Sequence, residues 1–404
     1  MVFIVTVISY SGCLAQYLEE VSSTEIFSTA NSIYVQDGIV YIAGYDTLLQ
    51  IIEVTDPSVP EPVGFYDTTG SADHVFVNSG LAFVPNWSAG LLIYDISDSY
   101  NPILLGSYNT PHVEHDVVAN KNFAYLAICN YLKILDISNP AYPTLMGELH
   151  LDNAPDCRSI IKKGPYVLMS NLAGSVFIIN VTNPLYPFLA AEYMANGLTW
   201  EVFVNGDYCY IACDRNGLEI IDISNPENPQ YVTSIEVPGR ADRVHCANNY
   251  AYVRSQSGGL YIYDISHPYN PVFITDYDYY FSRDLFAIGD YIYLVNSHHL
   301  IILRFTPTGI EPVGQLPASF YLSPNYPNPF NARTTIRYSL PDASPVTLDI
   351  YDLLGRKVQT LYNGPQPPGE HSLIWNADGF ASGVYFYRLT AGEYEKTEKM
   401  TVIK

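Results

Sequence analysis

The chain has 404 residues, 48% of them hydrophobic, and a formal net charge of −22 at pH 7. The hydrophobic content excludes a disordered chain. The acidity argues against a nucleic-acid or anionic-membrane partner, because phosphate binding requires clustered cations. A chain of this length exceeds one compact core, so we expect two domains or a repeat architecture. The 36 tyrosines, 28 prolines and 26 glycines favour strands joined by tight turns.

The first residues are typical of exported proteins. An apolar run from Val2 to Ile8 is followed by small and polar residues ending at Ala15, which predicts a secretory signal peptide cleaved after Ala15. The run is shorter than the ~20 apolar residues that cross a bilayer, so no transmembrane span is predicted. Lipid attachment at Cys13 is an alternative. The five later cysteines show no paired CxxC spacing, so we expect buried free thiols and no zinc site.

A short motif close to Asp-Ile-Ser-Asn-Pro recurs through most of the chain. Its copies begin at Glu53, Asp95, Asp136, Asn180, Asp222, Asp264 and, in degenerate form, Arg304. A period near 42 residues, with four strand-length runs in each copy, is typical of propeller blades. Seven innermost strands are expected to start near Ile33, Val75, Val117, Ile160, Val202, Val244 and Leu285. The sequence therefore predicts an all-β fold with a seven-bladed β-propeller over residues 16–310.

The last copy of the repeat lacks an outer strand after Phe305, whereas a strand-like segment, Tyr17 to Ile26, precedes the first inner strand. We predict that this N-terminal segment pairs with Leu300 to Phe305 and completes the last blade. Such pairing removes the open edge that a repeat array would otherwise expose.

The repeat resembles a known family. The segments Gly90 to Ser97 (GLLIYDIS) and Gly217 to Ser224 (GLEIIDIS) are similar to the LVIVD repeat of extracytoplasmic bacterial proteins. The resemblance covers residues 17 to about 306. It implies a propeller and indicates little about the ligand.

The end of the chain differs in composition. Residues 1–310 hold 32 acids and 11 Lys and Arg, whereas residues 311–404 hold 9 acids and 8 Lys and Arg. This change predicts a domain boundary near residue 310, with a linker at 311–319 and a second domain at 320–404. Residues 320–404 alternate apolar and polar side chains at period two between turn-forming residues, which predicts a small Ig-like antiparallel β-sandwich.

Four motifs in this tail resemble the type IX secretion C-terminal sorting domain, type A: LSPNYPNPFN from Leu322, YDLLGRKV from Tyr351, GVYFY from Gly383 and the final KMTVIK. The residues that carry the match are Asn325, Tyr326, Pro327, Asn328, Pro329, Phe330, Asn331, Gly355, Arg356, Gly383, Tyr385 and Lys404. The resemblance implies a Bacteroidetes-type or allied bacterium and the type IX secretion machinery as partner. It implies a protein attached to the cell surface or released. An ordinary Ig-like accessory domain is the alternative.

Catalytic signatures such as Gly-x-Ser-x-Gly, His-Glu-x-x-His or a Walker loop do not occur in the sequence, and no cofactor is predicted. Instead, polar residues precede most of the inner strands, at one end of the predicted central channel. This candidate binding ring contains Asp73, His74, His115, Asp116, Arg158, Trp200, Glu201, Asp242, Arg243, Arg283 and Asp284. The functional interpretation is a ligand site with Trp200 as a stacking platform. The structural interpretation is a set of contacts between blades that fixes their geometry.

A weaker candidate is a cation site at the third inner strand. Strict alternation places His112, Glu114 and Asp116 on one side of the strand and His115 on the other, and three such side chains suit a divalent cation.

Three functions remain open from the sequence. The first is a non-enzymatic, exported module that binds a protein or glycan through one face of the disc. The second is a polysaccharide-degrading enzyme at the channel mouth, with His115 or His74 as general base. The third is a calcium-binding structural or adhesive surface protein.

Overall fold

The computed structural model describes residues 17–403 except 46–47, 69, 88, 111–113, 153–155, 257, 279–281, 307–319, 323–324, 326–327, 341–343, 367–368, 378 and 393. The predicted signal peptide at 1–15, the predicted linker at 311–319 and Lys404 lie outside these residues. The chain divides into two compact units, Met1–Thr308 and Gly309–Lys404. All regular structure in the described part is β, as predicted. This part accordingly contains no helix suited to crossing a membrane.

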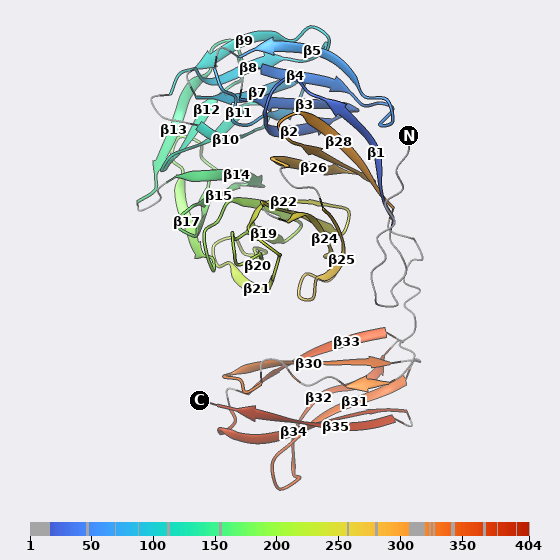
Figure 1. The fold of residues 1–404 in the computed structure, drawn as a ribbon. Coiled ribbons are helices and arrows are strands. Elements are labelled where there is room, and N and C mark those ends of the chain that lie inside the picture. Colours follow the sequence, from blue (N-terminus) through green and yellow to red (C-terminus); the bar gives the residue numbers. More distant parts are fainter. Residues whose placement is uncertain are drawn as a thin grey trace. The chain divides into compact units, whose positions relative to one another are not determined.

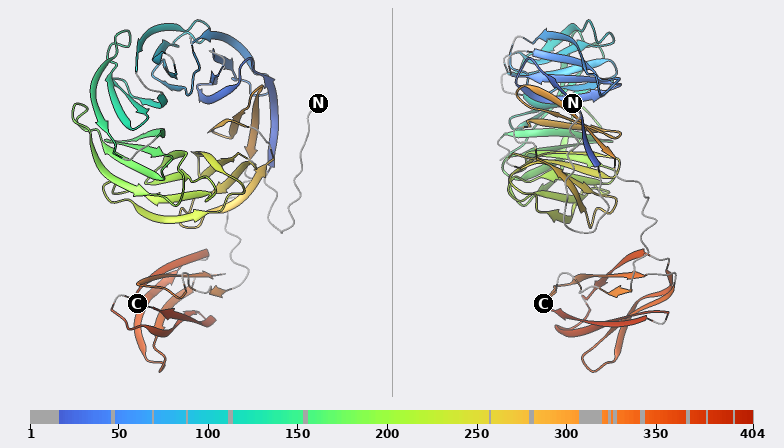
Figure 2. Two further views of the ribbon diagram at one scale, coloured as in Figure 1. Left: turned by 60° about the vertical axis from the view of Figure 1, so that its left-hand side comes forward. Right: turned by 45° about the vertical axis from the view of Figure 1, so that its right-hand side comes forward.

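The first unit is built from repeated four-stranded antiparallel sheets arranged in a ring, as expected for a propeller (Figure 1, Figure 2). Counting described residues only, there are seven sheets. Each of the first six sheets is given from its innermost to its outermost strand. The first sheet contains β2 (Ala30–Gln36), β3 (Ile39–Gly44), β4 (Leu48–Glu53) and β5 (Glu61–Asp67), the second β6 (Phe76–Asn78), β7 (Leu81–Asn86), β8 (Gly90–Asp95) and β9 (Ile103–Tyr108), and the third β10 (Glu114–Ala119), β11 (Phe123–Ile128), β12 (Tyr131–Asp136) and β13 (Thr144–His150). The fourth sheet contains β14 (Cys157–Lys163), β15 (Tyr166–Asn171), β16 (Ser175–Asn180) and β17 (Phe188–Met194), the fifth β18 (Glu201–Asn205), β19 (Tyr208–Ala212), β20 (Leu218–Asp222) and β21 (Gln230–Ile235), and the sixth β22 (Ala241–Ala247), β23 (Tyr250–Ser255), β24 (Gly259–Asp264) and β25 (Val272–Tyr277).

The last sheet closes the ring with strands from both ends of the unit. It contains β26 (Asp284–Ile288), β27 (Tyr291–Val295), β28 (His299–Thr306) and, outermost, β1 (Tyr17–Glu25). β1 pairs with β28 in antiparallel register from Tyr17 opposite Thr306 to Glu25 opposite His299. In Figure 2, β1 follows the outside of the ring beside the last strands. Inner strands of neighbouring sheets touch around the whole ring, β26 with β2 included. The predicted pairing of the N-terminal segment is confirmed.

The recurring motif turns the chain from the third to the fourth strand of a sheet. In the copy at Asp222, the carboxylate accepts a hydrogen bond from the Ser224 amide at 2.8 Å. Ile223 is buried, and its amide donates to the Asp207 carbonyl at 2.8 Å. The prolines that follow have no N–H, so neither strand nor helix continues. The motif is therefore a turn signal between the third and fourth strands.

The five cysteines in the described part of the first unit are free thiols, as expected: Cys157, Cys209, Cys213 and Cys246 are buried, and Cys129 is partly buried. Burial raises the pKa of Cys157 to about 12, so this thiol stays protonated at neutral pH.

The second unit packs two antiparallel sheets on one shared core. One sheet has the order β29 (Tyr321–Leu322), β30 (Arg333–Leu340), β33 (Gly369–Asn376), and the other has the order β32 (Lys357–Gln366), β31 (Ser344–Tyr351), β34 (Gly383–Ala391), β35 (Tyr394–Val402). Trp375 is fully buried in this core, with the rings of Phe330 and Tyr385 at centroid distances of 5.7 and 5.3 Å. The period-two pattern of the tail thus buries one face of each sheet.

Candidate functional site

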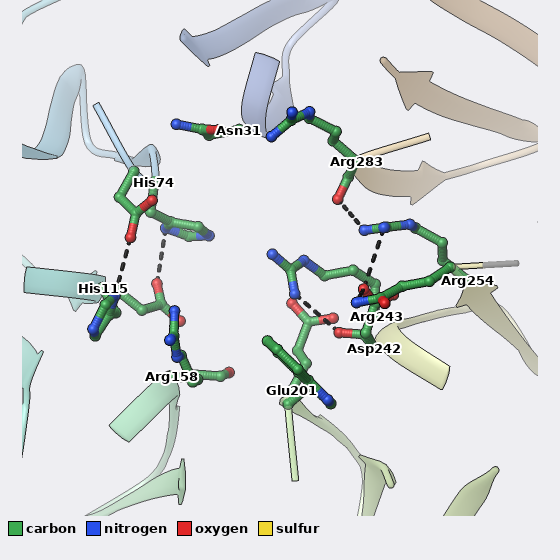
Figure 3. A pocket seen from close by; sticks show the side chains of 14 residues that line it. Asn31, His74, His115, Arg158, Glu201, Asp242, Arg243, Arg254 and Arg283 are labelled. Atoms are coloured by element: carbon green, nitrogen blue, oxygen red, sulfur yellow. Dashed lines mark hydrogen bonds and ion pairs between the residues drawn. The ribbon is translucent and has the colours of Figure 1, made fainter. Parts of the chain in front are cut away.

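The inner strands begin around a cavity of about 230 Å³ at one end of the ring (Figure 3). Two consecutive residues lie at or just before the start of each inner strand. The first mouth positions are Asn31, Asp73, His115, Arg158, Trp200, Asp242 and Arg283, and the second mouth positions are Ser32, His74, Asp116, Ser159, Glu201, Arg243 and Asp284. All members of the predicted binding ring except Asp284 line this cavity. Asp284 lines a second cavity that adjoins the first, and its carboxylate lies 3.4 Å from Arg243 Nε.

A bulge in the inner strands explains why two consecutive side chains face the same cavity. In β10, Glu114 pairs with Ile128 and Asp116 with Ala127, so His115 is an extra residue. The same shift makes Asn31, Arg158 and Asp242 extra residues in β2, β14 and β22. A bulge interrupts alternation and redirects a side chain. The expected placement of His115 on the opposite side of the strand from Asp116 is therefore wrong, since both line one cavity.

Several side chains at the second mouth positions bind the backbone of the next sheet. The Ile160 amide donates to Asp116 Oδ2 at 2.8 Å, and the Val244 amide donates to Glu201 Oε2 at 2.6 Å. The Ile33 amide donates to Asp284 Oδ2 at 3.0 Å, and the Val202 amide to Ser159 Oγ at 3.4 Å. The four contacts connect neighbouring sheets, as the structural interpretation of the ring requires.

Histidines and carboxylates connect the sheets on one side of the mouth. His115 Nδ1 lies 3.1 Å from Asp73 Oδ2, and His115 Nε2 lies 2.9 Å from Asp156 Oδ1. His74 Nδ1 lies 2.8 Å from Asp116 Oδ1. Burial alone would lower the pKa of His74, but nearby carboxylates, with Asp116 first, outweigh it and raise the pKa to about 9. His74 therefore carries a positive charge at neutral pH.

Arginines dominate the other side of the mouth. Arg254 pairs with Asp242 at 3.2 Å and also donates to the Arg283 carbonyl, and Arg243 Nε lies 3.4 Å from Asp284 Oδ1. Burial raises the pKa of Glu201 to about 8 against the opposing effect of the Arg243 guanidinium. Burial thus favours the neutral form of this carboxyl group.

Arg158, Trp200 and Arg283 complete the mouth. The Arg158 guanidinium pairs with Asp156 at 2.6 Å and lies over the Trp200 ring, 5.8 Å from its centroid. The exposed Arg283 side chain makes no ion pair or side-chain hydrogen bond among the described residues. Figure 3 shows Arg158 and Arg283 on different sides of the opening.

An aromatic layer lies below the polar mouth, and the sequence analysis missed it. It lines a second cavity of about 270 Å³, which shares His74, Asp116, Ser159 and Glu201 with the first. Ring-centroid distances connect its members in an arc: Phe76–Tyr34 at 5.3 Å, Tyr34–Phe286 at 4.9 Å, Phe286–His245 at 4.5 Å and His245–Phe203 at 4.4 Å. Burial lowers the pKa of His245 to about 3, so the imidazole is neutral. Each member lies two residues after a second mouth position, a signal that alternation supplied.

The proposed cation site receives no support. His112 and the Glu114 side chain lie outside the described part of the structure. Among described residues, no group of three or more His, Cys, Asp and Glu is placed to hold a metal ion.

Comparison with protein families matches five segments to the LVIVD repeat: residues 29–68, 69–110, 114–150, 196–237 and 238–279. Together they cover just over half of the chain. The chain belongs to the LVIVD-repeat family. The sheet β14–β17 lies between matched segments and has the same strand order, so the repeat continues through it.

A protein of known structure is similar in fold to this LVIVD-repeat protein. The computationally designed Ika8 protein, known from a crystal structure, matches 71% of this chain over 99% of its own, with a TM-score of 0.55 and 9% identity. At that identity the likeness concerns the fold alone. The curated proteins contain no match.

Residues 325–404 match the secretion system C-terminal sorting domain. This tail links the LVIVD-repeat protein to type IX secretion and points to a secreted or cell-surface location. In the structure, the Thr401 amide donates to Asn328 Oδ1 at 2.9 Å, and the Phe330 amide donates to the Thr401 carbonyl at 3.0 Å. The motif near Asn325 is thus held against the last strand.

The remaining residues of the sorting motif have separate places. Gly355 takes a positive φ of 75° in the turn where Arg356 Nε binds Asp352 at 2.7 Å. Asn331 and Gly383 are exposed, and Tyr385 is buried. Tyr326, Pro327 and Lys404 lie outside the described residues.

Proposed function

We propose that this protein is an exported, non-enzymatic binding module. Its first unit is a seven-bladed propeller that binds a protein or glycan at the channel mouth. Its tail is an Ig-like sandwich that directs export and surface attachment or release. Support comes from the repeated four-stranded sheets, the pairing of β1 with β28 and the sorting-domain match. A closed ring holds its loops in fixed positions, so binding orders few additional residues.

The single observation that carries the binding proposal is that the residues at the two mouth positions make different contacts. Side chains such as Asp116 and Glu201 are engaged with the next sheet. The bulge places the preceding residue, such as His115 or Arg158, in the cavity as well. The first mouth positions therefore add polar side chains to the cavity, and some of them, such as His115, also contact a neighbouring sheet.

The two histidines of the mouth are poorly suited to general-base catalysis. Both nitrogens of His115 face carboxylates, and His74 is already protonated at neutral pH. A general base needs an unprotonated atom within reach of the substrate. This favours binding without turnover.

One feature favours an enzyme as the second candidate: Glu201 lines the cavity, and burial raises the pKa of its carboxyl group, as in a general acid. Incubation with a panel of polysaccharides decides between the two. Products that the full chain releases and the Glu201→Gln variant does not would favour the enzyme.

The binding proposal is tested with Trp200→Ala and His115→Ala in the full chain, on glycan arrays and by capture of protein partners. We expect either substitution to reduce the signal roughly tenfold or more, as for a buried contact residue. Trp87→Ala and His267→Ala are matched controls, since these exposed residues lie away from the cavity. Signals that are the same for mouth and control variants would leave the ring with a structural role only.

A further inference from the structure

Arginine is concentrated at the mouth of an otherwise acidic unit. Residues 1–310 contain seven arginines, and four of them, Arg158, Arg243, Arg254 and Arg283, line the 230 Å³ cavity. The same residues contain 32 acids. Guanidinium groups present several N–H donors in a plane and suit carboxylate and phosphate groups. The mouth is therefore a local exception to the charge of its surroundings.

Most charged groups of the mouth are paired within the protein, whereas among the described residues the Arg283 guanidinium is not. Asp116 accepts from the Val117 and Ile160 amides and pairs with His74. Among described residues, the buried donors Arg158 Nε and Arg254 Nε have no hydrogen-bond partner, and the buried acceptor Asp242 Oδ1 has none either. Arg283 adds an exposed guanidinium. A ligand that complements this surface brings acceptors and negative charge.

The aromatic layer beneath the mouth indicates that the other part of the ligand is apolar. Its cavity is lined by Tyr34, Phe76, Phe203, His245 and Phe286 together with aliphatic side chains, and it measures about 270 Å³. A cavity of about 150 Å³ already accommodates a benzene ring. The two cavities share the lining residues His74, Asp116, Ser159 and Glu201, so they adjoin each other.

We infer that the mouth binds a small organic monoanion, a carboxylate attached to an apolar ring or chain. The carboxylate lies at Arg283, and the apolar part rests on the aromatic layer. A monoanion is favoured over a phosphate dianion because Asp116, Asp242 and Asp73 stand in the same cavity. This inference concerns the same site and goes beyond the proposed function, because a small carboxylate is neither a protein nor a glycan.

The test uses the full chain and isothermal titration with three probes: 3-phenylpropionate, the neutral 3-phenylpropanol, and propionate without the ring. We expect 3-phenylpropionate to bind best. Arg283→Gln is expected to weaken its binding roughly tenfold or more, as for loss of a charge-assisted hydrogen bond. Arg215→Gln is the matched control, because Arg215 is exposed and does not line the cavity. Equal affinity for acid and alcohol would overturn the anionic half of the inference.

The aromatic half is tested with Phe286→Leu and, as a second position, Phe203→Leu, with thermal melting without ligand as the check on folding. We expect several-fold weaker binding of 3-phenylpropionate and unchanged binding of propionate, since only the ring contact is altered. Unchanged binding of 3-phenylpropionate in both folded variants would overturn this half. If none of the acids binds but Trp200→Ala still abolishes a glycan or protein signal, this inference fails and the proposed function stands. If mouth variants alter no binding at all, both fail.

Discussion

The two mouth positions of the ring stand side by side in the sequence and do different work. At the second position, Asp116 and Asp284 are buried and accept backbone hydrogen bonds from a neighbouring sheet. At the first position, Arg283 is exposed and Asp73 is only partly buried. A polar residue at a channel mouth is therefore informative only once its contact with the next sheet is known. Carboxylates at the second position bind the backbone of the next sheet. The first position holds residues that also contact a neighbouring sheet, such as Asn31 and His115, together with the exposed Arg283.

Removal of Asp116 is expected to give the largest effect on stability. In Asp116→Ala, the Ile160 amide loses its acceptor and His74 its counter-ion in a buried setting. We expect the free energy of unfolding of the first unit to fall by about 3 kcal/mol or more in urea denaturation. Asp73→Ala, the matched change at a first position, should cost about 1 kcal/mol or less. Equal losses in the two variants would erase the distinction between the positions.

The charge on His74, a second-mouth-position residue, makes the stability of the first unit depend on pH. Its folded-state pKa of about 9 lies above the ordinary value of 6.5, so its contribution is fully present below pH 6.5 and is lost as pH rises through 9. The contribution is at most about 3 kcal/mol. We expect the urea midpoint to fall between about pH 6.5 and 9.5, and to fall less in His74→Gln. A pH dependence that is identical in this variant and in the chain itself would show that His74 is not the group responsible. His267→Gln, at an exposed site, is the control.

A smaller effect is expected where the contact between sheets is a neutral, long hydrogen bond. Ser159 Oγ accepts from the Val202 amide at 3.4 Å. Ser159→Ala should lower the free energy of unfolding by about 1 kcal/mol. The exposed Ser266→Ala should stay within about 0.5 kcal/mol of the chain itself. If Ser159→Ala matched Asp116→Ala, the charge of the contact would not matter.

Much of the ring was predictable because its signals are local and periodic. The 42-residue spacing and the turn chemistry around copies such as Asp222 predicted four-stranded sheets, and the unpartnered segment from Tyr17 to Ile26 predicted the pairing with β28. The bulge at His115 was not predictable in the same way. It depends on the register of β10 against β11, which strict alternation does not supply.

Which residues line the mouth was easier to predict from the sequence than which of them contact the next sheet. The polar pairs before each inner strand predicted the position of the mouth. The contact of Glu201 with Val244 joins two sheets, and a local sequence pattern does not indicate a contact between residues so far apart in the chain. The aromatic layer did have a signal, since Phe203 follows Glu201 by two residues and Phe286 follows Asp284 in the same way. It was missed because each of these residues alone is an ordinary strand residue.

The adjacent pair Arg283 and Asp284 offers the most direct test, because one strand carries both positions. Asp284 accepts from the Ile33 amide at the junction of β26 with β2 and lies 3.4 Å from Arg243, whereas Arg283 has no such side-chain contact among described residues. The measurement is the free energy of unfolding of the first unit in Asp284→Ala and Arg283→Ala. The account predicts a loss of about 3 kcal/mol for Asp284→Ala and a change within about 0.5 kcal/mol for Arg283→Ala. Losses of similar size in both variants would contradict it.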